Sequence, residues 1–148
     1  LGHVLGAPDY YDLHSDLSSN ECFRAIGEYD VMSGGQWNKY GECPAHHNPY
    51  TKCYIFGWDT PTTITAATAE YTISSATTSK GNFYRIDTHT EGEFFLLEHR
   101  SYHWFDKFIP NCGLLIYHAH KDLELAINND EDINCAHPLK LYLVNSLI

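Results

Sequence analysis

The sequence predicts an α+β fold, in which short helical segments come first and mainly antiparallel strands follow. Helix-stop residues and turn glycines dominate the chain up to Trp58, whereas β-branched and aromatic residues dominate from Thr60 onward. No internal repeat or long linker interrupts the 148 residues, which are enough for one hydrophobic core. We therefore expect residues 1–148 to form a single domain.

The composition is that of a folded, acidic protein. Hydrophobic residues make up 43% of the chain and aromatic residues 14%, which argues against disorder. The net charge of -10 disfavours nucleic acids and anionic membranes as partners, because both require a basic face. No apolar run is long enough for a membrane span.

The five cysteines contain no C-x-x-C pair, which makes a cysteine-rich zinc site improbable. Free buried thiols are one interpretation of them. Two bridges are conceivable if the protein is secreted, namely Cys43 with Cys53 and Cys112 with Cys135.

The first stretch of the chain, Leu1 to Asp12, contains the main candidate site. We expect His3 near the end of a helix that Gly6 stops in a left-handed conformation, and Pro8 then turns the chain away. This reversal brings Asp9 toward His3. An imidazole and a carboxylate that converge are suitable ligands for one zinc ion. A plain helix stop, with a surface histidine and an Asx-type bond from Asp9, explains the same spacing.

A glycine-rich turn around Met32 is the second candidate element. Met32 is the only methionine, and Gly34 and Gly35 follow it closely. Small residues permit a tight turn, and a thioether can form an apolar, adaptable floor beneath a metal without being a ligand. For an isolated motif, a core methionine beside a turn is the simpler interpretation.

Residues 44–58 read as one helix, with Pro49 in its first turn and Gly57 at its end. His46 and His47 within it are adjacent, and adjacent helical residues point about 100° apart. At most one of them can face a given site, so we interpret both as core or surface histidines.

The remainder of the chain predicts strands, with a turn at residues 110–113. Glu98, His99 and Arg100 end the most apolar strand, where an ion pair is the simpler reading and a substrate site the alternative. His118 and His120 alternate onto one face, a spacing that suits metals but is also common in plain strands. The predicted strands are residues 62–65, 71–73, 82–86, 93–100, 113–118 and 139–144.

Four of these segments, in this order, resemble the secreted zinc metallopeptidases of the immune-inhibitor-A type. L-G-H-V-L-G-A-P-D-Y-Y-D is similar to the back half of the signature H-E-x-x-H-x-x-G-x-x-H/D, with Asp as the third ligand. Y-D-V-M-S-G-G is similar to the family's Met-turn, and P-A-H-H-N-P-Y-T-K to a segment that ends in Gly-Trp. F-F-L-L-E-H-R followed by G-L-L-I-Y-H matches its strand motifs, with His99 in place of Asn.

The resemblance implies the C-terminal part of a metzincin-like catalytic domain: the tail of the zinc helix, the Met-turn, one or two helices and antiparallel strands. It implies a secreted, extracellular zinc endopeptidase that acts on protein or peptide substrates through a metal-activated water. His3 and Asp9 would be metal ligands, with Gly6 and Met32 as structural support. The other histidine and the general-base glutamate would immediately precede Leu1, so we expect no catalytic residue within this chain and no activity from it alone.

Alternatives from other classes are a secreted, aromatic-rich β module that binds a glycan or a protein, and a catalytically dead relative kept for adhesion. Calcium is a candidate for a second cofactor, because oxygen-bearing side chains cluster in two places. Solvated loops explain both clusters more simply. The two clusters are Asp12 with Asp16 and Asn20, and the acidic run 128–134.

Overall fold

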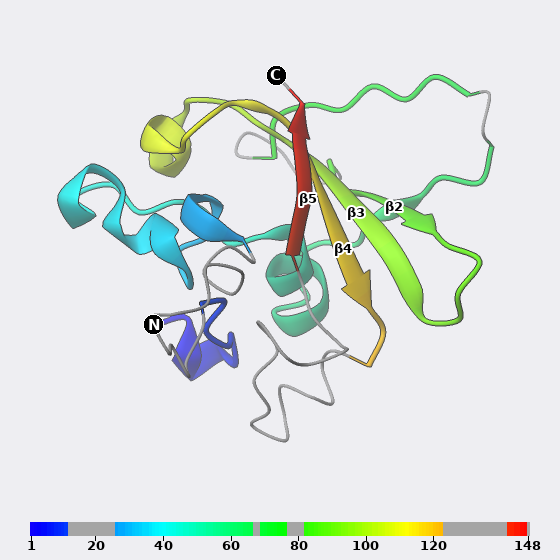
Figure 1. Cartoon of the computed structure of the whole chain (residues 1–148), viewed down its shortest axis with the longest axis horizontal. Coiled ribbons are helices and arrows are strands. Elements are labelled where there is room, and N and C mark those ends of the chain that lie inside the picture. Colours follow the sequence, from blue (N-terminus) through cyan, green and yellow to red (C-terminus); the bar gives the residue numbers. More distant parts are fainter. Residues whose placement is uncertain (12–25, 67–68, 77–81, 123–141, 148) are drawn as a thin grey trace, which may run out of the picture.

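The predicted α+β class is confirmed in a computed structural model, which describes residues 1–11, 26–66, 69–76, 82–122 and 142–147, the last of these as backbone only. A mostly antiparallel sheet forms one part of the molecule, and short helical segments gather beside it (Figure 1). Both possible calcium clusters lie wholly outside the described residues.

The sheet has five strands in the simple order β1-β2-β3-β4-β5. The edge strand β1 is parallel to β2, and the three other pairings are antiparallel. The long strand β3 is central, as its apolar sequence predicts. The strands are β1 (Thr62–Thr63), β2 (Tyr84–Asp87), β3 (Glu93–Arg100), β4 (Gly113–His120) and β5 (Tyr142–Leu147).

The strand predicted at residues 71–73 is wrong. These residues lie outside the sheet ladder, because the neighbouring edge of β2 already pairs with β1. The ring of Tyr71 instead packs edge-on against Tyr84, whose hydroxyl donates a hydrogen bond to the Thr72 carbonyl. The prediction for 139–144 is shifted: β5 is described from residue 142 to 147, and 139–141 lie outside the described residues.

The helical segments are short, and all but one are 3-10 turns. The helix predicted over 44–58 is correct only from Pro49 onward. The Asn48 side chain accepts a hydrogen bond from the Thr51 N–H (2.9 Å) and starts the helix there, while Gly57 ends it with a φ of 63°. The segments are η1 (His3–Leu5), η2 (Gly27–Tyr29), η3 (Gly34–Gly41), the π-helical η4 (Thr51–Ile55) and η5 (Trp104–Phe108).

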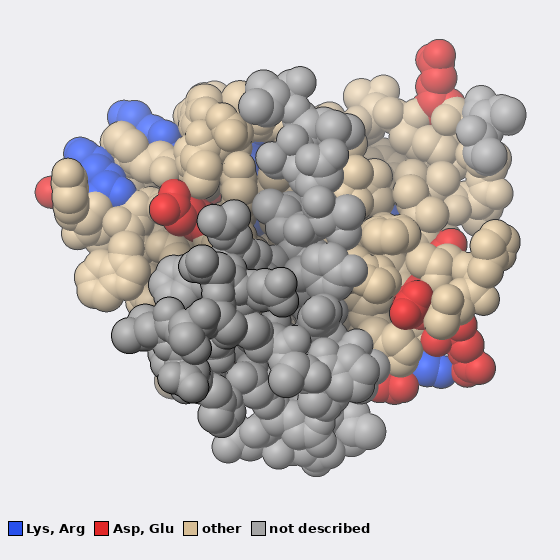
Figure 2. All heavy atoms as spheres, viewed as in Figure 1, with Lys and Arg blue, Asp and Glu red and all other residues tan. Residues whose placement is uncertain are grey.

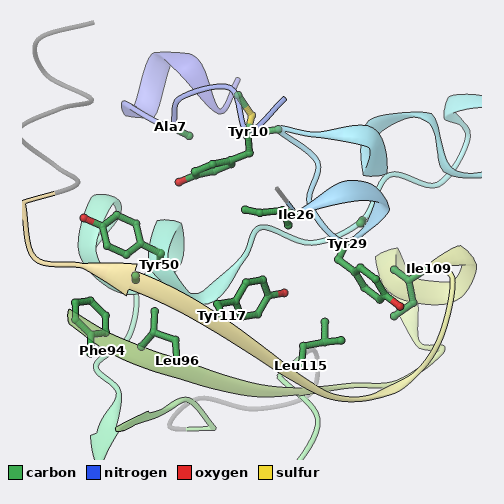
Figure 3. Close-up of a cluster of buried hydrophobic side chains, with 13 residues drawn as sticks. Ala7, Tyr10, Ile26, Tyr29, Tyr50, Phe94, Leu96, Ile109, Leu115 and Tyr117 are labelled. Carbon is green, nitrogen blue, oxygen red and sulfur yellow. The ribbon is translucent and has the colours of Figure 1, made fainter. Parts of the chain in front are cut away.

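The core lies between the helical segments and one face of β3 and β4. Alternate residues of β3 are buried on this face, so Phe94 and Leu96 point inward beside Tyr117 of β4. Tyr10 and Tyr50 approach from the opposite side, from the N-terminal loop and the start of the η4 region (Figure 3). Tyr10 thereby anchors the segment that carries Asp9 in the core.

The conceivable bridge between Cys43 and Cys53 is absent, since both thiols are free. The Cys43 thiol instead faces the carbonyl oxygens of Trp104 (3.5 Å) and Phe105 (3.6 Å). Cys112 is also free, and its suggested partner Cys135 lies outside the described residues.

Over the part of the chain that is described, no helix has the length and apolar character needed to cross a bilayer. Acidic and basic side chains are dispersed over the visible described surface, with the basic ones mainly over η3 and η5 (Figure 2). This view shows no broad basic face of the kind that nucleic acids require.

Candidate metal centre

His3 and Asp9 converge as the sequence predicts. Gly6 ends η1 with a φ of 92°, and its N–H donates to the His3 carbonyl at 3.0 Å. The Ala7 N–H donates to the Gly2 carbonyl, also at 3.0 Å, and Pro8 follows. The chain therefore folds back, and His3 Nε2 lies 3.2 Å from Asp9 Oδ1.

A contact with the backbone determines which ring nitrogen of His3 carries the hydrogen. The other nitrogen, which faces Asp9, is then an acceptor. His3 Nδ1 lies 3.0 Å from the Ala7 carbonyl oxygen, which can only accept, so Nδ1 carries the hydrogen. In the neutral ring, the Nε2 lone pair then points at a carboxylate oxygen. Two facing lone pairs repel each other unless a proton or a metal cation lies between them. The carbonyl contact is also the usual way in which a metal-binding histidine is oriented.

The spacing of the pair fits zinc. Two ligands at normal zinc distances in a tetrahedral site are about 3.3 Å apart, close to the observed 3.2 Å. The His3 side chain is 61% exposed and Asp9 22%, so the pair is open to solvent and to further ligands. The described residues contain no group of three or more His, Cys, Asp or Glu side chains that could hold a metal. His3 and Asp9 fit as a part of a zinc site.

Tyr11 joins this pair, although the sequence analysis did not single it out. Its exposed side chain forms a hydrogen bond with Asp9. Partial burial raises the pKa of the Tyr11 hydroxyl, and the hydrogen bond to Asp9 and the Asp9 charge raise it further. The phenol therefore stays protonated and can orient the carboxylate.

Met32 packs against Gly2, the residue that precedes η1. A Cβ atom added to Gly2, the residue before His3, would stand 2.4 Å from the Met32 sulfur. A side chain at position 2 would therefore require the flexible Met32 side chain to move aside. The Met32 carbonyl accepts a hydrogen bond from the Tyr10 N–H (2.8 Å), and the Ser33 hydroxyl donates to the Tyr10 carbonyl (3.0 Å). The turn thus holds the loop that presents Asp9.

Asp30 organises the turn from within, a role that the sequence did not reveal. Its carboxylate is fully buried and accepts hydrogen bonds from the N–H groups of Met32 and Asn48, each at 2.5 Å. Asn48 Nδ2 donates to the same carboxylate at 2.7 Å. Burial raises the pKa of Asp30, and these hydrogen bonds oppose the rise.

His46 and His47 point to different surroundings and do not form a pair of ligands. The His46 ring packs edge-on against Phe105, and the His47 ring against Phe56. Burial, followed by the charge of Lys52, lowers the pKa of His46 to about 3 and of His47 to about 4. Both rings are therefore neutral and belong to the packing of the site's surroundings.

A buried ion cluster supports the segment that carries these two histidines. Arg100 contacts Glu98 (2.8 Å) and Asp106 (2.7 Å), and its Nη2 donates to the His47 carbonyl (2.9 Å). Asp106 in turn accepts from the His46 N–H (3.0 Å). The ion pair expected at the end of β3 is therefore present, as a structural anchor.

His118 and His120 share one face of β4, as predicted, but lie away from the candidate metal centre. His118 lies 3.7 Å from Glu93, and His120 lies 3.7 Å from Asp122. Within the described chain these side chains form no metal-binding group of three.

Comparisons with models of known protein families, with curated proteins and with solved structures gave no match. What the site can do follows from its own geometry.

Proposed function

We propose that this chain is the C-terminal part of a metzincin-like zinc endopeptidase, secreted and acting on protein or peptide substrates. The observation that carries the proposal is the His3–Asp9 pair, 3.2 Å apart, with Nε2 of His3 left free to bind by the contact of Nδ1 with Ala7. The packing of Met32 against Gly2, the residue before His3, agrees with the Met-turn of that class.

In this proposal, His3 Nε2 and Asp9 Oδ1 are two protein ligands of zinc. When bound, zinc supplies Lewis acidity toward the scissile carbonyl and toward a water molecule. Asp9 adds negative charge, which weakens that acidity compared with an all-histidine site. Tyr11 orients Asp9, and Met32 provides an apolar floor that keeps η1 and the Asp9 loop together.

The proposal assigns the remaining histidine ligand and the general-base glutamate to a His-Glu pair before Leu1. Two ligands are too few for a tight tetrahedral zinc site, and no general base is assigned to the chain itself. We therefore expect the 148-residue chain to bind zinc weakly and to cleave no peptide.

The test compares this chain with a version extended upstream so that His-Glu stands directly before Leu1. Zinc content after dialysis and hydrolysis of a quenched fluorescent peptide library are measured for both. We expect stoichiometric zinc and activity only in the extended chain, and loss of both when His3 is replaced by Ala. Activity of the 148-residue chain, or an inactive extended chain that holds zinc, would contradict the proposal.

A further inference from the structure

A concave site lies on η3, on residues separate from the candidate metal centre. It has a volume of about 290 Å³, close to the lower end of the range for small-molecule sites. Its lining combines three aromatic rings with charged and amide groups. The principal lining residues are Glu28, Trp37, Asn38, Lys39, Tyr40 and Phe108.

The aromatic rings at this site are unusually open to solvent. Trp37 is 70% exposed, Tyr40 is 97% exposed and Phe108 is 39% exposed. Exposed rings grouped around one hollow are costly in water and commonly mark a site of contact. Tryptophan and tyrosine also offer flat faces with a polar edge, which suits ligands that are partly apolar and partly polar.

The backbone that presents these rings is strained. Lys39 and Tyr40 both take left-handed conformations, with φ of 50° and 58°, although neither is glycine. Each such residue costs on the order of 1–2 kcal/mol. Non-glycine residues in such conformations cluster at functional sites. The conformation is held by hydrogen bonds from the Glu42 N–H to the Lys39 carbonyl (3.2 Å) and from the Cys43 N–H to the Asn38 carbonyl (3.3 Å).

The site carries polar groups of both signs. Asn38 Nδ2 donates to the Glu28 carbonyl (3.0 Å) and so ties η3 to η2. Lys39 Nζ forms an ion pair with Glu42 (3.0 Å) and lies over the Phe108 ring, 5.2 Å from its centre. Hydrogen-bond donors and acceptors thus stand beside flat apolar faces.

This arrangement distinguishes between two ligand classes. An aromatic hollow with a carboxylate can also suit a quaternary ammonium group. Here, however, the chain's own Lys39 and Lys107 ammonium groups both lie over the Phe108 ring, 5.2 and 5.8 Å from its centre, and their charges would repel a cationic ligand. A neutral ligand with many hydroxyl groups uses both the donors and the acceptors, and its C–H faces can stack on Trp37 and Tyr40.

We propose that the hollow formed by Trp37, Tyr40, Phe108, Glu28 and Lys39 binds a carbohydrate ring. The volume accommodates one or two hexose units. The site is independent of zinc, so it would serve the chain whether or not His3 and Asp9 bind metal.

The test is titration of the full 148-residue chain with the methyl glycosides of glucose, galactose, mannose and N-acetylglucosamine, followed by tryptophan fluorescence and isothermal titration calorimetry. We expect saturable millimolar binding of at least one glycoside. Tyr40→Ala should weaken it by about tenfold, since stacking is lost from a side chain that contributes little to folding. Trp37→Ala should weaken it by a similar factor.

Trp104→Ala is the matched control, because Trp104 is 75% exposed on η5 yet does not line the hollow. It should leave glycoside binding unchanged. Equal loss in the Trp104 and Trp37 variants would indicate nonspecific adsorption and overturn the proposal. The absence of saturable glycoside binding would also overturn the proposal. Preferential binding of tetramethylammonium, or binding of phosphatidylcholine vesicles in place of glycosides, would do the same.

Discussion

Asp30 and Asn48 are joined by hydrogen bonds from both the main-chain N–H and the side-chain amide of Asn48, at 2.5 and 2.7 Å. Asn48 also starts the helical segment that contains η4, and Asp30 also holds the Met32 N–H. One buried carboxylate therefore connects the Met32 turn to the helical segment that contains η4. The packing of the candidate metal centre depends on this connection.

Replacing Asp30 by Asn should destabilise the protein by about 2–4 kcal/mol. A neutral amide loses the charge-assisted hydrogen bonds, and its NH₂ group would face the N–H donors from which the carboxylate now accepts. The measurement is the free energy of unfolding in urea, monitored by tyrosine and tryptophan fluorescence. Asp87→Asn is the control, since Asp87 is exposed and its change should stay within about 0.5 kcal/mol. Equal effects of the two substitutions would refute the role given to Asp30.

Gly35 and Gly34 provide a closely matched pair of substitutions in the same turn. A Cβ at Gly35 would lie 2.6 Å from the Asp30 carbonyl oxygen and 2.8 Å from that of Glu28, both of them backbone atoms. At Gly34 the nearest contacts are 3.4 Å. Gly35→Ala should therefore lower the free energy of unfolding by about 1–3 kcal/mol, and Gly34→Ala by less. A reversed order would show that the turn is packed differently.

Arg100→Met should cost about 3–5 kcal/mol, because it leaves Glu98 and Asp106 buried without the ion pairs that they form with Arg100. Adding Glu98→Gln should recover part of this loss, and a double-mutant cycle measures the coupling. Lys121→Met removes an exposed ion pair with Glu91 and should leave stability nearly unchanged. A small effect of Arg100→Met would mean that solvent reaches the cluster.

His46 and His47 should make the protein less stable as the pH falls below 6.5. Their pKa values are lowered to about 3 and about 4 in the folded state, so between pH 6.5 and 4 the unfolded chain binds more protons. Stability therefore rises with pH across this window, by at most about 1.4 kcal/mol per pH unit for each ring. Above pH 6.5 both rings are neutral in both states and contribute no further change.

The check is urea unfolding at several pH values for the wild type and for the double variant His46→Gln, His47→Gln. The difference in unfolding free energy between the two proteins isolates these rings from the carboxylates that titrate in the same range. We expect the wild-type curve to be steeper between pH 4 and 6.5. Parallel curves would contradict the burial of the two rings.

Local signals in the sequence were sufficient to predict that the two side chains of the candidate metal pair meet. The run from His3 through Gly6 and Pro8 to Asp9 determines a helix stop and a reversal by backbone chemistry alone, and the two side chains meet as predicted. The central position of strand β3 was also predicted from local sequence, because a short apolar run flanked by charged residues is typical of a buried strand.

Features that depend on distant partners could not be predicted. Asn48 starts the helix late because it is also bound to Asp30, and no local pattern reveals that bond. Tyr71 lies in a β-branched stretch, yet the place beside β2 is taken by β1. The free thiol of Cys43 likewise reflects where η5 packs, which spacing along the chain does not encode.

The central claim is that His3 and Asp9 bind zinc together, and cobalt(II) and zinc titrations of the full chain test it most directly. Two protein ligands should contribute about half of the 10–16 kcal/mol of a complete structural site, hence a dissociation constant of the order of 10⁻⁴–10⁻⁶ M. His3→Ala and Asp9→Ala should each weaken binding by at least about tenfold, whereas His118→Ala should not. Unchanged affinity in the His3 and Asp9 variants, or a loss only with His118→Ala, would contradict the account.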